Sequence, residues 1–556
     1  MMHHAFVSIR LRFHSHSGCR RRCQGTAVAR LLPVSLLPVS LLLVSLCSPA
    51  APAADTAVRT VAVEGTVADR PTPASTSVDT RKPWQERAIT SHVSLGRLGA
   101  GDGQLDANTL EQLRDAGEIL FSARFTTEDG VGRPFATQAI LPTKRRRAAQ
   151  TPFSRTAGLD ANACASCHHQ PSIGGAGDFA ANVFVSEGFS QADFDTTDPQ
   201  FSNERNTNHL FGAGLIELLA REMTQDLQRL RGEALKQSAA SGDVVEQALE
   251  SKGVDFGSLR AHPDGRVDTR PLDGVDIDLV VRPFGQKGVM TSLRQFTVNA
   301  LNHHHGMQAD ERFGARWTGE ADHDGDGHES EITAGDVSAL VAWQASLPPP
   351  GKHSPDNPLW QQAARRGEAR FEALGCAHCH RPALPLDSTV FRDPGPYDAA
   401  GTLRSGEATS DSGSNKGPGS GRDPESDSRL HVVPDLQYDL GMLAAVAALP
   451  KDAEGRVLVP LWGDLKRHTI ADTTIAALGN EHLSQRFVER NVFMTGELWG
   501  VASTGPYGHR GDMTTLAEII DAHGGEARAA RDAWGVLDAA ARDEIIAFLK
   551  TLVIDP

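Results

Sequence analysis

Residues 164–168 read Cys-Ala-Ser-Cys-His, and residues 376–380 read Cys-Ala-His-Cys-His. One turn of helix places both thiols of such a stretch on one side, where they can bond the two vinyl groups of a single porphyrin. The histidine that follows can then point its imidazole at the iron. The sequence therefore predicts two covalently attached c-type haems, each with its proximal ligand fixed. The residues concerned are Cys164, Cys167 and His168, and Cys376, Cys379 and His380.

A zinc site and a redox dithiol are the alternatives for a closely spaced cysteine pair. A zinc site lacks a clear partner pair of cysteines here, and two copies that each end in histidine are hard to obtain by chance. By their spacing, His169 and His378 are bystanders.

Residues 1–54 have the pattern of a secretory signal peptide. Residues 1–30 carry six arginines and no acid, residues 31–46 are almost wholly apolar, and small residues fill 50–54. The apolar run is short of the about 20 residues that a spanning helix needs, and two prolines interrupt it, so stable membrane insertion is not expected. We expect a periplasmic or secreted protein.

The distribution of the seven cysteines is consistent with export. Cys19, Cys23 and Cys47 lie in the segment that cleavage would remove, which leaves only the four cysteines of the two motifs. An exported chain with no others uses its thiols for attachment and not for a disulfide framework.

The chain is acidic, with a formal net charge of −15, and loss of six arginines would make it −15 − 6 = −21. Such a protein is a poor nucleic-acid binder. A negative surface can dock a basic electron-transfer partner, although it is more often a solvated face.

Composition and periodicity divide the chain. A flexible leader is expected at 55–84, an N-terminal haem domain at 85–350 and a C-terminal haem domain at 351–556. The second domain contains an insertion at 399–429 that is too poor in apolar residues to order itself.

Helical spacing occurs at 109–122, 209–230 and 244–250, whereas 251–288 is mixed and has room for short strands. Residues 335–347 and 542–552 are similar amphipathic segments, each downstream of one haem motif. This repeat predicts a mainly α fold of two cytochrome c-like haem domains with long loops and few short strands.

Further stretches give the chain, from about Phe121 to Leu552, a resemblance to the bacterial dihaem oxidoreductases. These are relatives of dihaem cytochrome c peroxidase and of the methylamine dehydrogenase maturation enzyme. The matching stretches are 160–168, 174–177, 210–217, 283–287, 464–468, 498–500, 504–511 and 523–527.

The resemblance implies that the C-terminal haem transfers electrons. In those peroxidases its distal ligand lies 14 residues beyond the histidine of a Pro-Tyr-x-His-x-Gly loop, which here is His509; 509 + 14 gives His523. His380 and His523 would then both ligate the second iron, with His509 near the ligands or between the haems. The alternative for His523 is a plain histidine at a helix end.

The first haem departs from that pattern. Activation-dependent peroxidases carry a distal histidine about one and a half dozen residues past the motif, but here the first histidine after His169 is His209. The resemblance therefore implies an open or differently ligated first iron, for which 303–305, all histidine, and Met307 are competing ligand sources.

Acid–base groups for splitting an O–O bond would come from Glu204, His209 or Glu217. The alternative is that Glu217 and His209 only cap or pack their helix.

Asp322, Asp324 and Asp326, followed by Gly327, begin like a hand-type calcium loop. Position twelve is Thr333 where a bidentate glutamate is usual, and Glu331 is the nearest substitute. The related peroxidases hold calcium between their domains, where this loop falls. A solvated acidic turn is the alternative.

Together these features predict an oxidoreductase that moves electrons from a small donor, a cytochrome or a cupredoxin, through the C-terminal haem to hydrogen peroxide at the N-terminal haem. The alternatives are an electron-transfer cytochrome without catalysis and an oxygen-using dihaem oxidase.

Overall fold

The computed structural model describes residues 84–99, 103–132, 135–136, 145–146, 162–178, 180–185, 202–398, 402–404, 408–410, 430–432, 435–481 and 488–555. The predicted signal peptide, nearly all of the predicted leader and most of the predicted insertion lie outside these residues. Within them, no helix is both long enough and apolar enough to cross a membrane.

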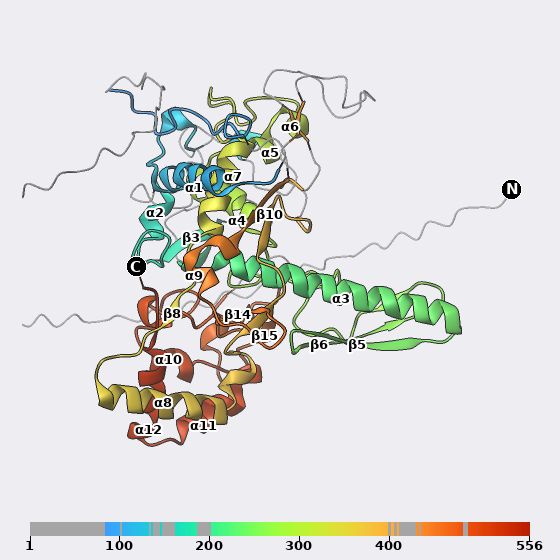
Figure 1. The fold of residues 1–556 in the computed structure, drawn as a ribbon, viewed down its shortest axis with the longest axis vertical. Coiled ribbons are helices and arrows are strands. Elements are labelled where there is room, and N and C mark those ends of the chain that lie inside the picture. The colour runs from blue at the N-terminus through green and yellow to red at the C-terminus, as the bar shows by residue number, and fades with distance from the viewer. Residues whose placement is uncertain are drawn as a thin grey trace, which may run out of the picture. The chain divides into compact units, whose positions relative to one another are not determined.

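The helices of the described chain are joined by long loops (Figure 1). They are α1 (Ala107–Ser122), α2 (Cys164–Cys167), α3 (Ala213–Ser241), α4 (Leu293–Ala300), α5 (Asp310–Phe313), α6 (Ala315–Thr318), α7 (Ala334–Ala345), α8 (Pro358–Ala373), α9 (Ala444–Ala447), α10 (Leu516–Asp521), α11 (Arg528–Gly535) and α12 (Ala539–Leu549). Shorter turns are η2 (Thr127–Asp129), η3 (Leu301–His305), η4 (Cys376–His378), η6 (Leu440–Met442), η7 (Ala477–Gly479), η8 (Val501–Ser503) and η9 (Gly525–Ala527).

The two segments that resemble each other in sequence are α7 and α12. The amphipathic pattern expected for α7 is wrong, because all twelve of its residues are buried. Each packs against the helix that precedes a haem motif: α7 lies on α1, and α12 lies on α8. A glycine permits each close crossing. A Cβ on Gly117 would lie 2.0 Å from the carbonyl oxygen of Ala339, and one on Gly367 would lie 1.8 Å from that of Glu544. The two halves therefore use the same helix crossing.

A phenylalanine four residues after each glycine continues this parallel. Phe121 lies 5.9 Å from the ring of His168, and Phe371 lies 6.1 Å from the ring of His380. Each also packs on an aromatic residue of the closing helix, with centroid distances of 4.4 Å to Trp343 and 5.5 Å to Phe548. The crossing thus positions the motif histidine through one aromatic ring.

The strands form small antiparallel sheets. The pairs are β1 (Phe135–Ala136) with β2 (Arg145–Arg146), β3 (Ala180–Val185) with β4 (Ser202–Asn206), β8 (Gly351–Lys352) with β17 (Leu552–Val553), β9 (Leu384–Leu386) with β14 (Val457–Val459), β10 (Val390–Asp393) with β13 (Leu436–Asp439), β11 (Ala408–Ser410) with β12 (Leu430–Val432), and β15 (Arg467–Thr469) with β16 (Val492–Met494). One sheet has three strands: β5 (Val245–Ser251), β6 (Val254–Ala261) and β7 (Val267–Asp268).

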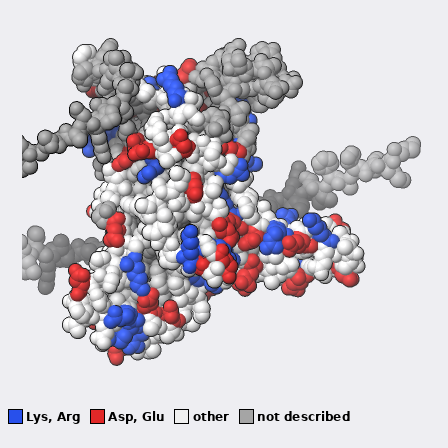
Figure 2. Space-filling model, in the orientation of Figure 1, with Lys and Arg blue, Asp and Glu red and all other residues white. Residues whose placement is uncertain are grey.

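The helix predicted at 244–250 is wrong, because this stretch is strand β5. Gly242, in the left-handed region at φ 76°, ends α3, and the chain then pairs with β6 from Val245 opposite Ala261. The short strands expected in 251–288 are confirmed by β6 and β7. Figure 2 shows acidic and basic side chains interspersed over this region on the face it draws.

Two hydrophobic clusters make up most of the core. The smaller one gathers Phe371, Trp462, Phe548 and their neighbours around α8 and α12. The larger one runs from Ile89 to Trp499 and includes apolar residues of β9, β10, β13 and β14. Segment 384–465, which follows the expected boundary at residue 350, therefore packs largely with residues that precede it.

Candidate haem sites

Both motifs open onto one cavity of about 1370 Å³. The first motif is the short helix α2, where the His168 N–H bonds the Cys164 carbonyl at 3.0 Å; the second is η4, where the His380 N–H bonds the Cys376 carbonyl at 3.0 Å. All four cysteines are half-buried and none is in a disulfide. The volume exceeds the range of about 300–1,000 Å³ for a single small-ligand pocket. The cavity therefore has the volume, the free thiols, the imidazoles and the apolar walls that two attached porphyrins need.

Both motif histidines are held by a backbone carbonyl. His168 donates from Nδ1 to Gly175 O at 3.2 Å, and His380 donates from Nδ1 to Trp462 O at 3.3 Å. A carbonyl oxygen only accepts, so the proton is on Nδ1 and the lone pair of Nε2 is available to a metal. Burial lowers the pKa of each imidazole to about 4, which keeps both neutral at pH 7.

Trp462 stands in an unusual conformation. Its φ of 55° lies in the left-handed region, as does the φ of 56° at Leu465, and bulky residues there are outliers. Strain of this kind persists where the surroundings over-determine it, often at functional sites. Here it falls on the residue whose carbonyl anchors His380.

His523 faces His380, with ring centroids 6.5 Å apart. Two metal–imidazole bonds of about 2 Å, plus about 1 Å from each nitrogen to its ring centre, give about 6 Å for two rings that share one iron. His523 follows α10 and donates from Nδ1 to Ile519 O at 2.6 Å, which leaves its Nε2 for a metal as well. The structure thus brings His380 and His523 together.

The first site has a different opposite wall. It is formed by α4 and by η3, a π-helical turn that carries His303, His304 and His305. Met307 is fully buried in the core and is not among the residues that line the cavity. Of the competing ligand sources, the structure places the histidine run at the cavity and Met307 behind it.

The predicted acid–base residues are separated by the fold. Glu204 accepts from Arg510 at 2.6 Å, and Glu217 accepts from the Leu293 N–H at 2.7 Å and pairs with Arg221. Burial raises the pKa of Glu217 to about 7. Neither carboxylate is among the residues that line the cavity.

His209 does line the cavity, but it has a structural contact. Its Nε2 donates to the carbonyl of Trp499 at 3.1 Å. Burial lowers the pKa of His209 to about 4. Of the three predicted acid–base residues, the structure brings only His209 to the haem cavity.

His509 lies in a buried cluster of charges at the cavity wall. Its ring packs against that of Phe493 at a centroid distance of 4.5 Å, and its Nε2 lies 3.5 Å from Glu481, which also contacts Arg205 and Lys287. Burial, reinforced by the nearby cations, lowers the pKa of His509 to about 2. His509 is therefore a neutral side chain of the wall.

A second imidazole near the second motif was missed in the sequence. His468 lies 2.9 Å from Asp464 and 2.7 Å from Glu526 through its two ring nitrogens. Burial opposes its charge, but hydrogen bonds, first to Asp464, raise its pKa. Cys379, Asp464 and His468 place ligand atoms within 4.8 Å of one another, yet an imidazolium paired on both nitrogens has no lone pair for a metal.

Glu497 was missed as well. It lines the cavity, and its Cγ lies 3.6 Å from where a Cβ on Gly463 would be, beside the Trp462 carbonyl that holds His380. Burial raises the pKa of Glu497 to about 7. Only the fold could identify it, because a glutamate between Gly496 and Leu498 has no spacing signal.

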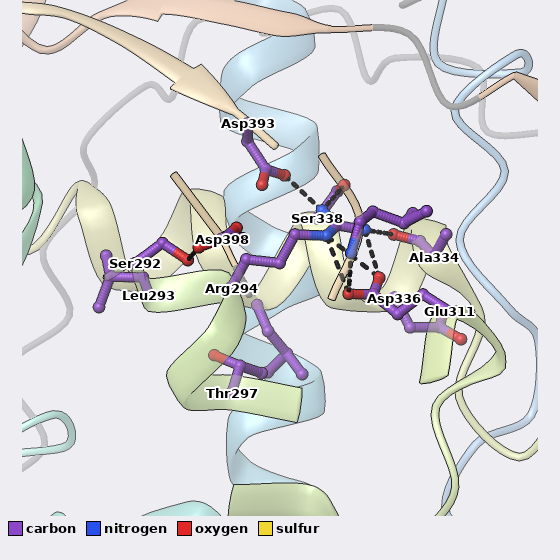
Figure 3. A network of polar contacts seen from close by, with 12 residues as sticks. Ser292, Leu293, Arg294, Thr297, Glu311, Ala334, Asp336, Ser338, Asp393 and Asp398 are labelled. Atoms are coloured by element: carbon purple, nitrogen blue, oxygen red, sulfur yellow. Dashed lines mark hydrogen bonds and ion pairs between the residues drawn. The ribbon is translucent and has the colours of Figure 1, made fainter. Parts of the chain in front are cut away.

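The wall of the first site is anchored from behind by a buried ion network (Figure 3). Arg294 of α4 contacts Glu311 at 2.7 Å, Asp393 of β10 at 2.8 Å and Ser338 of α7 at 2.9 Å. Arg294 is 1% exposed. Three segments are thereby joined to α4, whose residues Gln295 to Asn299 include several that line the cavity.

The three aspartates of the predicted calcium loop lie close together. Asp322, Asp324 and Asp326 bring carboxylate oxygens within 4.8 Å of one another. Thr333 instead caps α7, accepting from the Asp336 N–H, and Glu331 accepts from the Gln308 N–H at 2.8 Å. Calcium binding stays a prediction.

No protein-family model and no curated protein matches the chain. Among solved structures, hydrazine synthase of Kuenenia stuttgartiensis is similar with a TM-score of 0.31 and 13% identity, over 87% of this chain and 100% of that one. A MauG-like protein associated with microbial copper homeostasis is similar with a TM-score of 0.24 and 16% identity, over 61% and 88%. Likenesses this weak establish neither fold nor function, so the residues carry the case.

Proposed function

We propose that the chain is an exported dihaem c-type oxidoreductase, a peroxidase that takes electrons from a small donor protein at the second site and passes them to hydrogen peroxide at the first. The observation that carries this proposal is the inequality of the two sites. At the second site His523 faces His380 at a centroid distance of 6.5 Å. At the first, the ring contact of His168 is with Phe121, at 5.9 Å.

When bound, a c-type haem supplies an iron that changes oxidation state and so passes single electrons. A metal between two anchored imidazoles keeps the same ligands in both states, which suits electron transfer. A metal held from one side only has room for a small substrate. The arrangement therefore suits the second site as the relay and the first as the place of reaction.

The chain's own residues have defined tasks in this scheme. The Gly175 and Trp462 carbonyls orient the proximal imidazoles. Buried apolar side chains at the first site, among them Phe284 and Leu340, exclude bulk water. The overall reaction balances as one hydrogen peroxide, two electrons and two protons giving two waters, with the O–O bond broken and two donor molecules each oxidised by one electron.

Export is part of the proposal because its support is the predicted signal peptide at residues 1–54, which lie outside the described residues. The donor class rests on the resemblance of the sequence to dihaem oxidoreductases. A cytochrome or a cupredoxin each supplies the one-electron steps that the relay needs.

The test uses the purified dihaem protein, a reduced small c-type cytochrome and hydrogen peroxide. We expect two cytochromes oxidised per peroxide consumed, and one haem that is high-spin or binds cyanide. Cytochrome oxidation that instead consumes dissolved oxygen would identify the oxidase. Two low-spin haems inert to cyanide and peroxide would leave the electron-transfer cytochrome.

A further inference from the structure

The turn η3 places three consecutive histidines at the first site, and their surroundings differ. His305 packs edge-on against Phe125 at 5.4 Å, and its carbonyl accepts from the Gly132 N–H at 3.0 Å. His303 and His305 are 9% and 4% exposed, whereas His304 is only partly buried by the protein and lines the cavity. All three histidines line the cavity, and the middle one is the most exposed of them.

His304 also lies near the proximal ligand of this site. Burial is the main cause of the low pKa of His168, and the positive charge that His304 would carry when protonated lowers it further. Yet the two imidazoles are not in ring contact, as His523 and His380 are at 6.5 Å. His304 and His168 thus line the same cavity without the ring contact that His380 and His523 make.

The local backbone fits a functional position. A π-helical turn inserted at the end of an α-helix is rare and occurs often at functional sites. Here it follows α4 directly and ends at Gly306, in the left-handed region at φ 71°. Burial lowers the pKa of His304 to about 4, so at pH 7 the ring is neutral and has one basic nitrogen.

We propose that His304 is the acid–base residue of the first site. It takes the proton from the peroxide oxygen that enters nearest His168 and returns it to the far oxygen. The O–O bond then breaks and the far oxygen leaves as water. Two electrons from the donor and two protons from solvent complete the second water. This inference rests on the proposed peroxidase function and replaces Glu204 and Glu217 in the proton transfer.

The test measures cyanide binding to the resting ferric dihaem protein, without turnover. Cyanide enters as HCN at pH 7 and must lose its proton to bind, so a neighbouring base accelerates binding. Loss of such a base costs about 10²-fold. We expect His304→Gln to slow cyanide binding by about 10²-fold, to leave the spin state of the first haem unchanged, and to make the rate rise with pH as free cyanide ion forms.

His353→Ala is the matched control, because it removes an exposed histidine outside the cavity. His304→Ala repeats the test should glutamine disturb the packing of η3. Unchanged cyanide rates in both His304 variants would overturn the proposal. So would a wild-type first haem that is low-spin and becomes high-spin in both variants, since His304 would then be an iron ligand. A wild-type protein with no reaction towards cyanide or peroxide would refute the proposed function itself.

Discussion

The two motifs share a scaffold and differ in the wall that faces it. In both halves a glycine lets the closing helix cross the preceding helix, and a phenylalanine four residues later lies against the motif histidine. The second site is faced by the end of α10, which presents His523. The first is faced by α4 and η3, which present His304 without ring contact. One scaffold thus carries two different sites because the opposite wall comes from unrelated elements.

Removing attachment at one site should have the largest effect. Cys376→Ala with Cys379→Ala should yield a protein with one haem, no oxidation of the donor cytochrome, and cyanide binding retained at the first site. Cys164→Ala with Cys167→Ala should abolish cyanide binding but keep reduction of the second haem by the donor. The mass of the denatured protein and the haem absorption per protein chain show whether each variant has lost one covalently attached haem. Equal loss of both properties in both variants would mean that the sites do not divide the work.

Removing the facing histidine should change one site only. In His523→Ala the second haem should go from low-spin to high-spin, because His380 would be its remaining protein ligand, and the first haem should not change. Absorption and electron paramagnetic resonance spectra of the ferric protein measure this. His523→Met should restore a low-spin haem with a higher reduction potential, as His/Met ligation does.

The matched control is His378→Ala, which removes an exposed histidine inside the second motif. An unchanged second-haem spectrum in His523→Ala would discard the ligand assignment. A spectrum altered equally by His378→Ala would show that the change is not specific to the facing side.

The shared scaffold could be predicted from the sequence, whereas most of the facing walls could not. The motifs and the closing helices have spacing signals, and α7 and α12 lie where those signals indicate. The pairs Gly117 with Phe121 and Gly367 with Phe371 were a further signal that periodicity alone did not single out. Position 523 was found only through a family resemblance.

The walls depend on contacts between distant segments. His304 stood among three consecutive histidines, and only its greater exposure within the folded turn distinguishes it. Glu217 had the chemistry of a catalytic acid, but the fold turns it to the first N–H of α4 and to Arg221. At 244–250, the pairing with β6 and the end of α3 at Gly242 overrode a helical pattern.

Breaking the ion network behind α4 should weaken the first site more than the second. Arg294→Met leaves Glu311 and Asp393 buried without their cation, and loss of one partner of a buried pair costs about 3–5 kcal/mol. Denaturant unfolding measures the stability, and cyanide binding reports on the first haem. Arg270→Ala, which removes an 86% exposed partner of Asp268, should leave the stability almost unchanged. Equal losses would contradict the role of the network.

The smallest expected effect is at Glu497, beside the segment that anchors His380. Burial raises the pKa of Glu497 to about 7, so the carboxyl loses its proton as pH rises from 6 to 8. The new negative charge favours the oxidised haem, and the midpoint potential of the second haem should therefore fall over that window.

The fall should stay below about 59 mV per pH unit, the limit for one proton per electron. Glu497→Gln should remove this slope, as measured by redox titration at several pH values. If the second-haem potential of Glu497→Gln still fell with pH by the same amount, another group would be responsible for the pH dependence. The potential of the first haem should be the same in the variant and the wild-type protein.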